Sequence, residues 1–167
     1  MTLLNILEYP DPRLRTVASD VIEFNDDVER FGDNLLETMY HAPGIGLAAT
    51  QVDVHKRIIA VDVSEQHDTP YLFANPVLTL HGNNCSGEEG CLSVPGFYEP
   101  VMRAERVTVV AKNLRGEPFK LEAEGLLAVC IQHECDHLDG KLFVDYISNL
   151  KRNRIRKKLQ KLQKERA

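Results

Sequence analysis

Residues 132–140 read Gln-His-Glu-Cys-Asp-His-Leu-Asp-Gly, a stretch that contains the pattern His-Glu-x-x-His. On a helix, His133 and His137 lie on one face, one turn apart, because they are separated by four residues. Both imidazoles can then reach one metal ion, while Glu134 can lie beside a water on that ion. The apolar run 126–131 precedes the stretch and Gly140 follows it. The sequence therefore predicts a buried helix that ends near Gly140 and carries a metal site, the alternative being two ordinary core histidines.

A metal ion needs a third ligand, and the four cysteines are the first candidates. Cys135 lies about 200° around the helix from His133 and points away from it. Cys130 shares the face of the histidines, but it is about 10 Å along the helix from His137, too far to close around one ion. The third ligand should therefore come from another segment. Cys85 and Cys91 both remain candidates.

The amino-acid composition limits the kinds of protein that this chain can be. The chain has 167 residues, of which 43% are hydrophobic and 27% charged, as expected for one globular domain spanning residues 1–167. No apolar run approaches the length of about 18 residues that a membrane span needs. The N-terminus lacks the basic start and cleavage site of a signal peptide. Four irregularly spaced cysteines suit a reducing compartment, so we expect a cytoplasmic protein without a membrane partner.

The rest of the chain alternates short strands and helices. An amphipathic helix is predicted from Asn25, with Val28, Phe31, Leu35 and Met39 on one face. We expect short strands at 57–63, 71–74 and 77–80, a turn at 81–87, a hairpin over 105–122, and a final helix over 148–166. This order predicts an α+β fold, in which small antiparallel sheets pack around a central buried helix carrying the His-Glu-x-x-His motif, with an N-terminal and a C-terminal helix.

The C-terminal segment 148–167 is basic. From Lys151 onward, nine Lys and Arg residues face one acidic residue, a local charge of +8 that leaves −13 for the rest of the chain. This asymmetry indicates either an acidic partner or a solvated helix face. The apolar side of this helix consists of Ile147, Leu150, Ile155, Leu159 and Leu162.

Three segments occur together in a recognisable order: Gly-Ile-Gly-Leu-Ala-Ala-Thr-Gln at 44–51, Glu-Gly-Cys-Leu-Ser at 89–93, and Gln-His-Glu-Cys-Asp-His at 132–137. They resemble the three signature motifs of the peptide deformylases, and chain length and motif spacing extend the resemblance over essentially the whole chain. The chain is most similar to the bacterial type with an additional C-terminal helix. The resemblance implies a metal-dependent hydrolase that removes the formyl group from N-formylmethionyl nascent polypeptides and releases formate.

The resemblance also implies roles for individual residues. One divalent ion, commonly iron(II) with zinc, nickel or cobalt as substitutes, would be held by Cys91, His133 and His137. Glu134 would be the general base and later the general acid, while the Leu92 backbone N–H and the Gln51 side-chain amide would stabilise an oxyanion. The peptide-binding residues would be Ile45, Gly46, Glu89, Gly90, Leu126, Val129 and Cys130.

Two further features belong to the substrate side. Glu89 and Arg103 are expected to pair and to brace the groove, the alternative being a surface ion pair worth about 0–1 kcal/mol. Tyr98 stands where many bacterial members carry Arg, which leaves the recognition of the peptide side open.

Two rival interpretations can be stated. A broader-specificity metallopeptidase uses the same motif, but Phe143 stands where a metzincin carries its third histidine. The second, from a different class, is an RNA-associated protein whose fold merely retains a metal, and in this hypothesis the basic C-terminal helix contacts ribosomal RNA.

Overall fold

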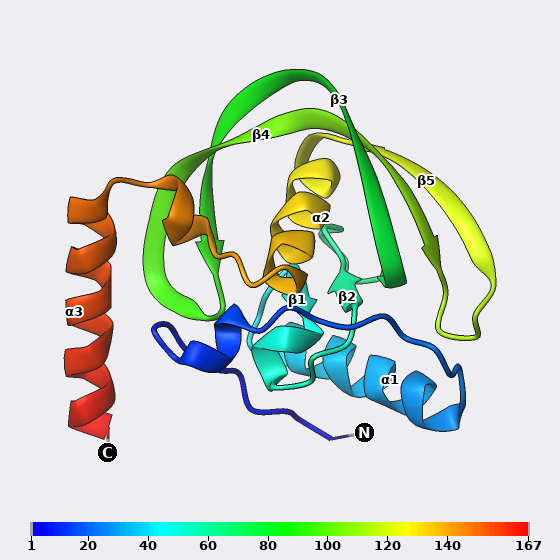
Figure 1. The fold of residues 1–167 in the computed structure, drawn as a ribbon, viewed down its shortest axis with the longest axis horizontal. Helices are drawn as coiled ribbons and strands as arrows, with labels where there is room; N and C mark the ends of the chain where they lie inside the picture. Colours follow the sequence, from blue (N-terminus) through cyan, green and yellow to red (C-terminus); the bar gives the residue numbers. More distant parts are fainter. Residues whose placement is uncertain (1, 167) are drawn as a thin grey trace.

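The computed structural model describes residues 2–166. The strands form one sheet that curves around a central helix (Figure 1). In chain order the elements are α1 (Asp26–His41), β1 (Gly46–Ala48), β2 (Ile58–Val61), β3 (Tyr71–Cys91), β4 (Val94–Lys112), β5 (Pro118–Glu124), α2 (Gly125–Leu138) and α3 (Asn149–Arg166). The predicted α+β class is confirmed.

All five strands belong to one antiparallel sheet in the order β1-β2-β3-β4-β5. The predicted hairpin between β4 and β5 is present. The prediction of a turn at 81–87 is wrong, because this segment continues β3 and pairs with β4, with Cys85 opposite Arg103. A register shift between His81 and Asn84 accommodates Gly82, which adopts a φ of +76°. Pairing along the long hairpin therefore outweighs the turn-forming composition of this segment.

The motif helix α2 lies in the middle of the molecule, under the arch that β3 and β4 form (Figure 1). Its apolar residues Ala128, Ile131 and Leu138 are fully buried in a core that also contains Phe73 and Val107 from the sheet. The predicted buried helix is thus present, and it ends at Leu138, two residues before Gly140. Because the helix is enclosed on most sides, side chains at its polar end are held in fixed positions.

Helix α1 covers a second core against β1 and β2. Its start at Asp26 follows the predicted N-cap, since the Asn25 side chain accepts a hydrogen bond from the Val28 amide at 3.1 Å. Gly32, in the middle of the helix, permits close packing: a Cβ at this position would lie 2.1 Å from Leu114 Cδ1.

Helix α3 lies at the outer edge of the molecule, separate from α1 and α2 in the view (Figure 1). Ile155 and Leu159 are buried against the third core, as the apolar stripe predicts, whereas Leu150 and Leu162 remain exposed. No helix within residues 2–166 has the length and apolar character that crossing a lipid bilayer requires.

Candidate active site

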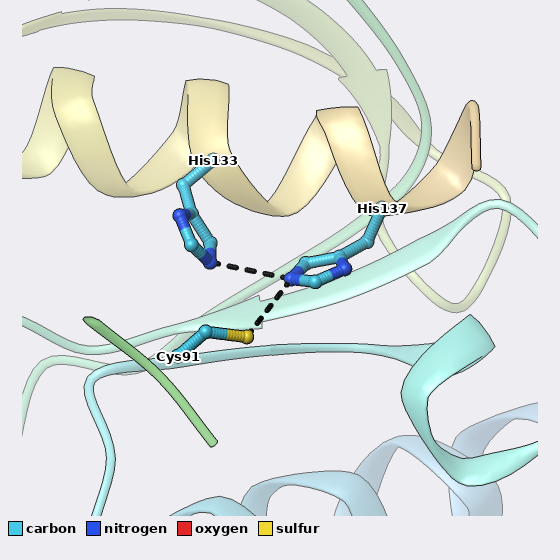
Figure 2. Close-up of side chains that lie close together, drawn as sticks. All are labelled: Cys91, His133 and His137. Atoms are coloured by element: carbon cyan, nitrogen blue, oxygen red, sulfur yellow. Dashed lines mark hydrogen bonds between the residues drawn. The ribbon is translucent and has the colours of Figure 1, made fainter. Parts of the chain in front are cut away.

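Two turns of α2 bring the predicted imidazoles together. The Nε2 atoms of His133 and His137 are 3.2 Å apart, and both side chains are buried (Figure 2). Four-residue spacing on a regular helix is sufficient to create this pair. Of the two candidate cysteines, Cys91 reaches the pair, with its Sγ 3.3 Å from His137 Nε2.

The position of Cys91 depends on the tip of the β3–β4 hairpin. Cys91 is the last residue of β3 and is paired with Val94, so only two residues form the turn. The Ser93 amide and the Gln51 side-chain amide each lie 3.4 Å from the Cys91 sulfur and donate to it. The hairpin tip therefore holds the thiol against the helix that carries the histidines.

The three donor atoms fit one tetrahedral metal ion. They lie within 4.8 Å of one another, and they are the one such group of His, Cys, Asp and Glu found among residues 2–166. Tetrahedral bonds of about 2.0–2.1 Å to nitrogen and 2.3 Å to sulfur separate ligand atoms by about 3.3–3.6 Å. The observed separations of 3.2 and 3.3 Å are close to these values. A thiolate with two imidazoles is also a donor set suited to iron(II) or zinc.

The other cysteines lie elsewhere. Cys85 is exposed on the hairpin. Cys130 is buried with its Sγ 3.5 Å from the Ile45 carbonyl oxygen, and Cys135 lines a separate cavity beside Arg57. The two cysteines of α2 therefore do not join the cluster, as the geometry of an ideal helix predicts.

Glu134 lies beside the cluster. Its carboxylate oxygens are 4.0 Å from the Nε2 atoms of His133 and His137, and Oε1 has no hydrogen-bond partner among the described residues. Burial raises the pKa of Glu134 to about 7, a value at which a carboxyl group can both accept and donate a proton near neutral pH. Gly46 packs against this carboxylate so closely that a Cβ would lie 2.4 Å from Oε2.

The second ring nitrogen of His133 has a carboxylate partner. His133 Nδ1 is 2.8 Å from Glu89 Oε1, and Arg103 donates to both Glu89 oxygens at 2.8 and 2.9 Å. Burial alone would raise the pKa of Glu89, but the hydrogen bonds from Arg103 and His133 lower it to about 2. An ionised Glu89 orients the imidazole so that Nε2 faces the metal position.

The Glu89–Arg103 pair itself is present, and both side chains are 5% exposed. The alternative of a surface ion pair is therefore wrong. Sequence reasoning also missed two partners of this pair, Asp136 and Tyr146, for which the sequence gives no local signal.

Gln51 lies on the other side of the thiol. It belongs to a short 3-10 helix, Ala49–Val52, and is 1% exposed. Its Oε1 accepts a hydrogen bond from the Ala48 amide at 2.9 Å, while its Nε2 donates to Ser93 Oγ at 3.0 Å. The amide group is thus oriented with its N–H groups towards the hairpin tip.

A groove of about 760 Å³ opens onto the cluster. Of the predicted peptide-binding residues, Ile45, Gly46 and Gly90 line it, together with Leu92. Glu89 does not line the groove and is buried in its pair with Arg103. The remaining three lie on α2 within the two turns before His133 and are not among the lining residues: Leu126, Val129 and Cys130.

Gly90 and Tyr98 form the rim of the groove. A Cβ at Gly90 would lie 2.4 Å from Tyr98 Cε1, and the Tyr98 side chain is 65% exposed. The aromatic ring therefore covers the space next to Gly90.

The chain is similar to known proteins over its full length. The model of the polypeptide deformylase family matches residues 3–153. Peptide deformylases of Teredinibacter turnerae and Pseudomonas aeruginosa are 62% and 59% identical to this chain, and each alignment covers 100% of both chains. Among solved structures, a peptide deformylase from Legionella pneumophila has a TM-score of 0.94 at 43% identity, covering 99% of this chain and 98% of that one. A peptide deformylase from Ehrlichia chaffeensis in complex with actinonin also has a TM-score of 0.94, at 37% identity and covering 100% of both chains. The chain therefore belongs to the peptide deformylase family, metalloenzymes that remove N-formyl groups from nascent peptides.

Proposed function

We propose that this protein hydrolyses the formyl amide of N-formylmethionyl peptides at the site formed by Cys91, His133 and His137, which hold one iron(II) ion. Zinc, nickel and cobalt are the expected substitutes, because the same donor set accepts them. The observation that carries the proposal is the fit of the three donor atoms to a single ion next to an unpaired buried carboxylate oxygen. When bound, the ion supplies Lewis acidity, which polarises a carbonyl and lets water ionise near neutral pH.

The residues around the ion transfer the proton and stabilise the charge that develops on the substrate. The Glu134 carboxylate accepts the proton of the attacking water and delivers it to the leaving amine, a role supported by its position 4.0 Å from the Nε2 atoms of His133 and His137. As charge develops on the oxygen of the formyl group, the Leu92 backbone N–H donates to it, and so does the Gln51 Nε2–H that contacts the Cys91 sulfur at 3.4 Å in this structure. Loss of one such donor typically costs about 2.7–4 kcal/mol of barrier.

The peptide binds as an additional strand. Strand β1 is at the edge of the sheet and pairs only with β2 among the described strands, and Ile45 and Gly46 at its start line the groove, where an extended chain can lie beside them. Ile45, Gly46 and Gly90 contribute main-chain contacts, which accept many sequences after methionine. The methionine side chain extends beyond the residues that line the groove, towards Leu126, Val129 and Cys130 of α2, and the 56% exposure of Leu126 supports an apolar contact there.

The decisive experiment is formate release from formyl-Met-Ala-Ser by protein purified without oxygen, with metal content measured on the same sample. We expect formate release from this peptide and none from a Cys91→Ala variant. Acetyl-Met-Ala-Ser and a longer peptide with internal bonds should remain intact. Cleavage of an internal bond without formate release supports the rival reading of a broader-specificity metallopeptidase. Reconstitution with iron(II), zinc, nickel and cobalt in turn identifies the ion that gives the highest kcat.

The basic face of α3 supports a second interaction, with ribosomal RNA. The exposed residues Arg154, Arg156, Lys157, Lys158, Lys161 and Lys164 form no ion pair within residues 2–166. Contact with the ribosome places the enzyme in the cytoplasm, where its substrates emerge.

Charge reversal tests this interaction without removing the buried Ile155 and Leu159. We expect a variant with Lys157, Lys158 and Lys161 changed to Glu to lose co-sedimentation with ribosomes at low salt. Wild-type binding should weaken steeply as salt rises. Reversal of Lys56 and Lys120, which lie outside α3, is the control. Unchanged co-sedimentation of the α3 variant contradicts the interaction.

A further inference from the structure

A buried guanidinium connects the metal ligands to a part of the molecule outside the groove. Arg103 is 5% exposed, and within residues 2–166 its ion-pair partners are two carboxylates. Its Nε and Nη2 donate to Glu89, while its Nη1 donates to Asp136 Oδ2 at 2.6 Å. Because the guanidinium is planar, a partner on Nη1 fixes the plane in which the other two hydrogen bonds to Glu89 are made.

Tyr146 closes the outer side of this arrangement. It is the last residue of a 3-10 helix, Phe143–Tyr146, and its side chain is 48% exposed. Its hydroxyl donates to Asp136 Oδ2 at 2.7 Å, and its ring lies 4.8 Å from the Arg103 guanidinium carbon. One aromatic side chain thus holds the carboxylate by a hydrogen bond and covers the cation by its face.

We propose that Asp136 and Tyr146 are positioning residues for the ligand His133, acting through Arg103 and Glu89. The inference rests on the proposed function, since it takes His133 as a metal ligand. The connection consists of consecutive contacts of 2.7, 2.6, 2.8 and 2.8 Å from the Tyr146 hydroxyl to His133 Nδ1. Partners of a ligating histidine commonly change metal affinity or activity by about 10–100-fold when they are removed.

The location of these residues separates positioning from peptide binding. Asp136 and Tyr146 line a separate cavity of about 460 Å³, and neither lines the groove that opens onto the metal cluster. Their loss should therefore change the retention of the ion and kcat, while KM for the peptide stays close to that of the wild type.

The test compares Tyr146→Phe and Asp136→Asn with a matched control, Tyr40→Phe. Tyr40 donates to the buried Asp62 at 2.6 Å, so this control removes a tyrosine–aspartate hydrogen bond that has no connection to the metal cluster. Each protein is loaded with cobalt(II) without oxygen. The measurements are the rate of cobalt release to an excess of chelator, the visible absorption spectrum of the bound cobalt, the melting temperature of the metal-free protein, and kcat and KM.

We expect about two- to five-fold faster release from Tyr146→Phe and about 10–100-fold faster release from Asp136→Asn. The visible spectrum should shift in both, kcat should fall in the same order, and KM should stay within two-fold. The control should lose stability without a change in release rate. Tyr146→Phe keeps the ring over Arg103, so its metal-free melting temperature should remain near that of the wild type.

Release rates and spectra equal to those of the wild type in Tyr146→Phe and Asp136→Asn overturn the inference while leaving the proposed function intact. Equal acceleration in the Tyr40→Phe control also overturns it, because a general loosening would then explain the effect. A wild-type protein that takes up no ion contradicts both. Should Asp136→Asn fail to fold, Tyr146→Phe decides the question alone.

Discussion

Gly46→Ala is a sharp test of the contact between β1 and the proposed general base. The added Cβ would lie 2.4 Å from Glu134 Oε2, 2.7 Å from Cys130 Sγ and 2.9 Å from Glu134 Cδ. Ordinary contact begins near 3.4 Å, so the carboxylate has to move by about 1 Å to relieve the overlap. A misplacement of about 1 Å in a catalytic group can cost about 100-fold in rate. We therefore expect kcat for formyl-Met-Ala-Ser to fall by about 100-fold.

Stability and substrate binding should respond differently from turnover in this variant. Glu134 and Cys130 are both 4% exposed, so overpacking should lower the free energy of unfolding by about 1–3 kcal/mol. The Gly46 amide remains, so KM should change little. The assay combines formate release, metal content and urea denaturation on the same preparation.

Gly87→Ala is the matched control, because a Cβ at that position of β3 would have no atom of the other described residues within 4 Å, apart from its two chain neighbours. Its kcat and stability should be within experimental error of the wild type. A Gly46→Ala protein that binds metal fully and keeps more than a third of the wild-type kcat refutes the reasoning. A raised KM with unchanged kcat would instead locate the effect of Gly46 in the main-chain contact with the peptide.

Three further predictions concern the metal and the core. Cys91→Ala should lose both bound metal and formate release, measured by metal analysis and turnover; full occupancy and unchanged turnover contradict the ligand role. Gly32→Ala should lower the free energy of unfolding by up to about 2 kcal/mol in urea, because its Cβ overlaps Leu114 and this exceeds the gain of about 1 kcal/mol in helix propensity; a more stable variant would show that Leu114 relaxes freely. Burial raises the pKa of Asp62, but hydrogen bonds led by that from Ser64 outweigh it and hold the pKa below its ordinary value. Above about pH 4, the ordinary carboxyl pKa, Asp62→Asn should therefore lower the free energy of unfolding by about 2–3 kcal/mol. This difference from the wild type should shrink as the pH falls further, as measured by urea unfolding at several pH values. A difference that stays constant down to pH 3 would contradict the assignment of this stability to the ionised carboxylate.

Local periodicity predicts the half of the site that lies on one helix. The four-residue spacing of His133 and His137 fixes their mutual position wherever the helix lies. The exclusion of Cys135 by its angle around the helix, and of Cys130 by its distance along the helix, also depends only on helix geometry. The choice between Cys85 and Cys91 could not be made in this way. It depends on the register of the β3–β4 hairpin, and the resemblance to a family supplied it.

The elements that were misjudged are those whose structure depends on distant partners. The segment 81–87 contains the residues of a turn, yet it forms a strand because β4 pairs with it along its length. Asp136 and Tyr146 meet Arg103 only once α2, the hairpin and the following 3-10 helix are packed together. No spacing within one segment indicates such a contact, so a sequence read alone could not predict it.

The C-terminal end of α3 lies at the edge of the groove. Arg166 pairs with Glu8 at 2.6 Å, and Glu8 lines the cavity that leads to the metal cluster. A polyhistidine tag attached beyond Arg166 would bring competing imidazoles near this opening. At the other end of the chain, the Thr2 amide donates to Asn34 on α1. Because Ile6 and Glu8 near that end also line the groove, metal occupancy of variants is best compared on protein without a polyhistidine tag.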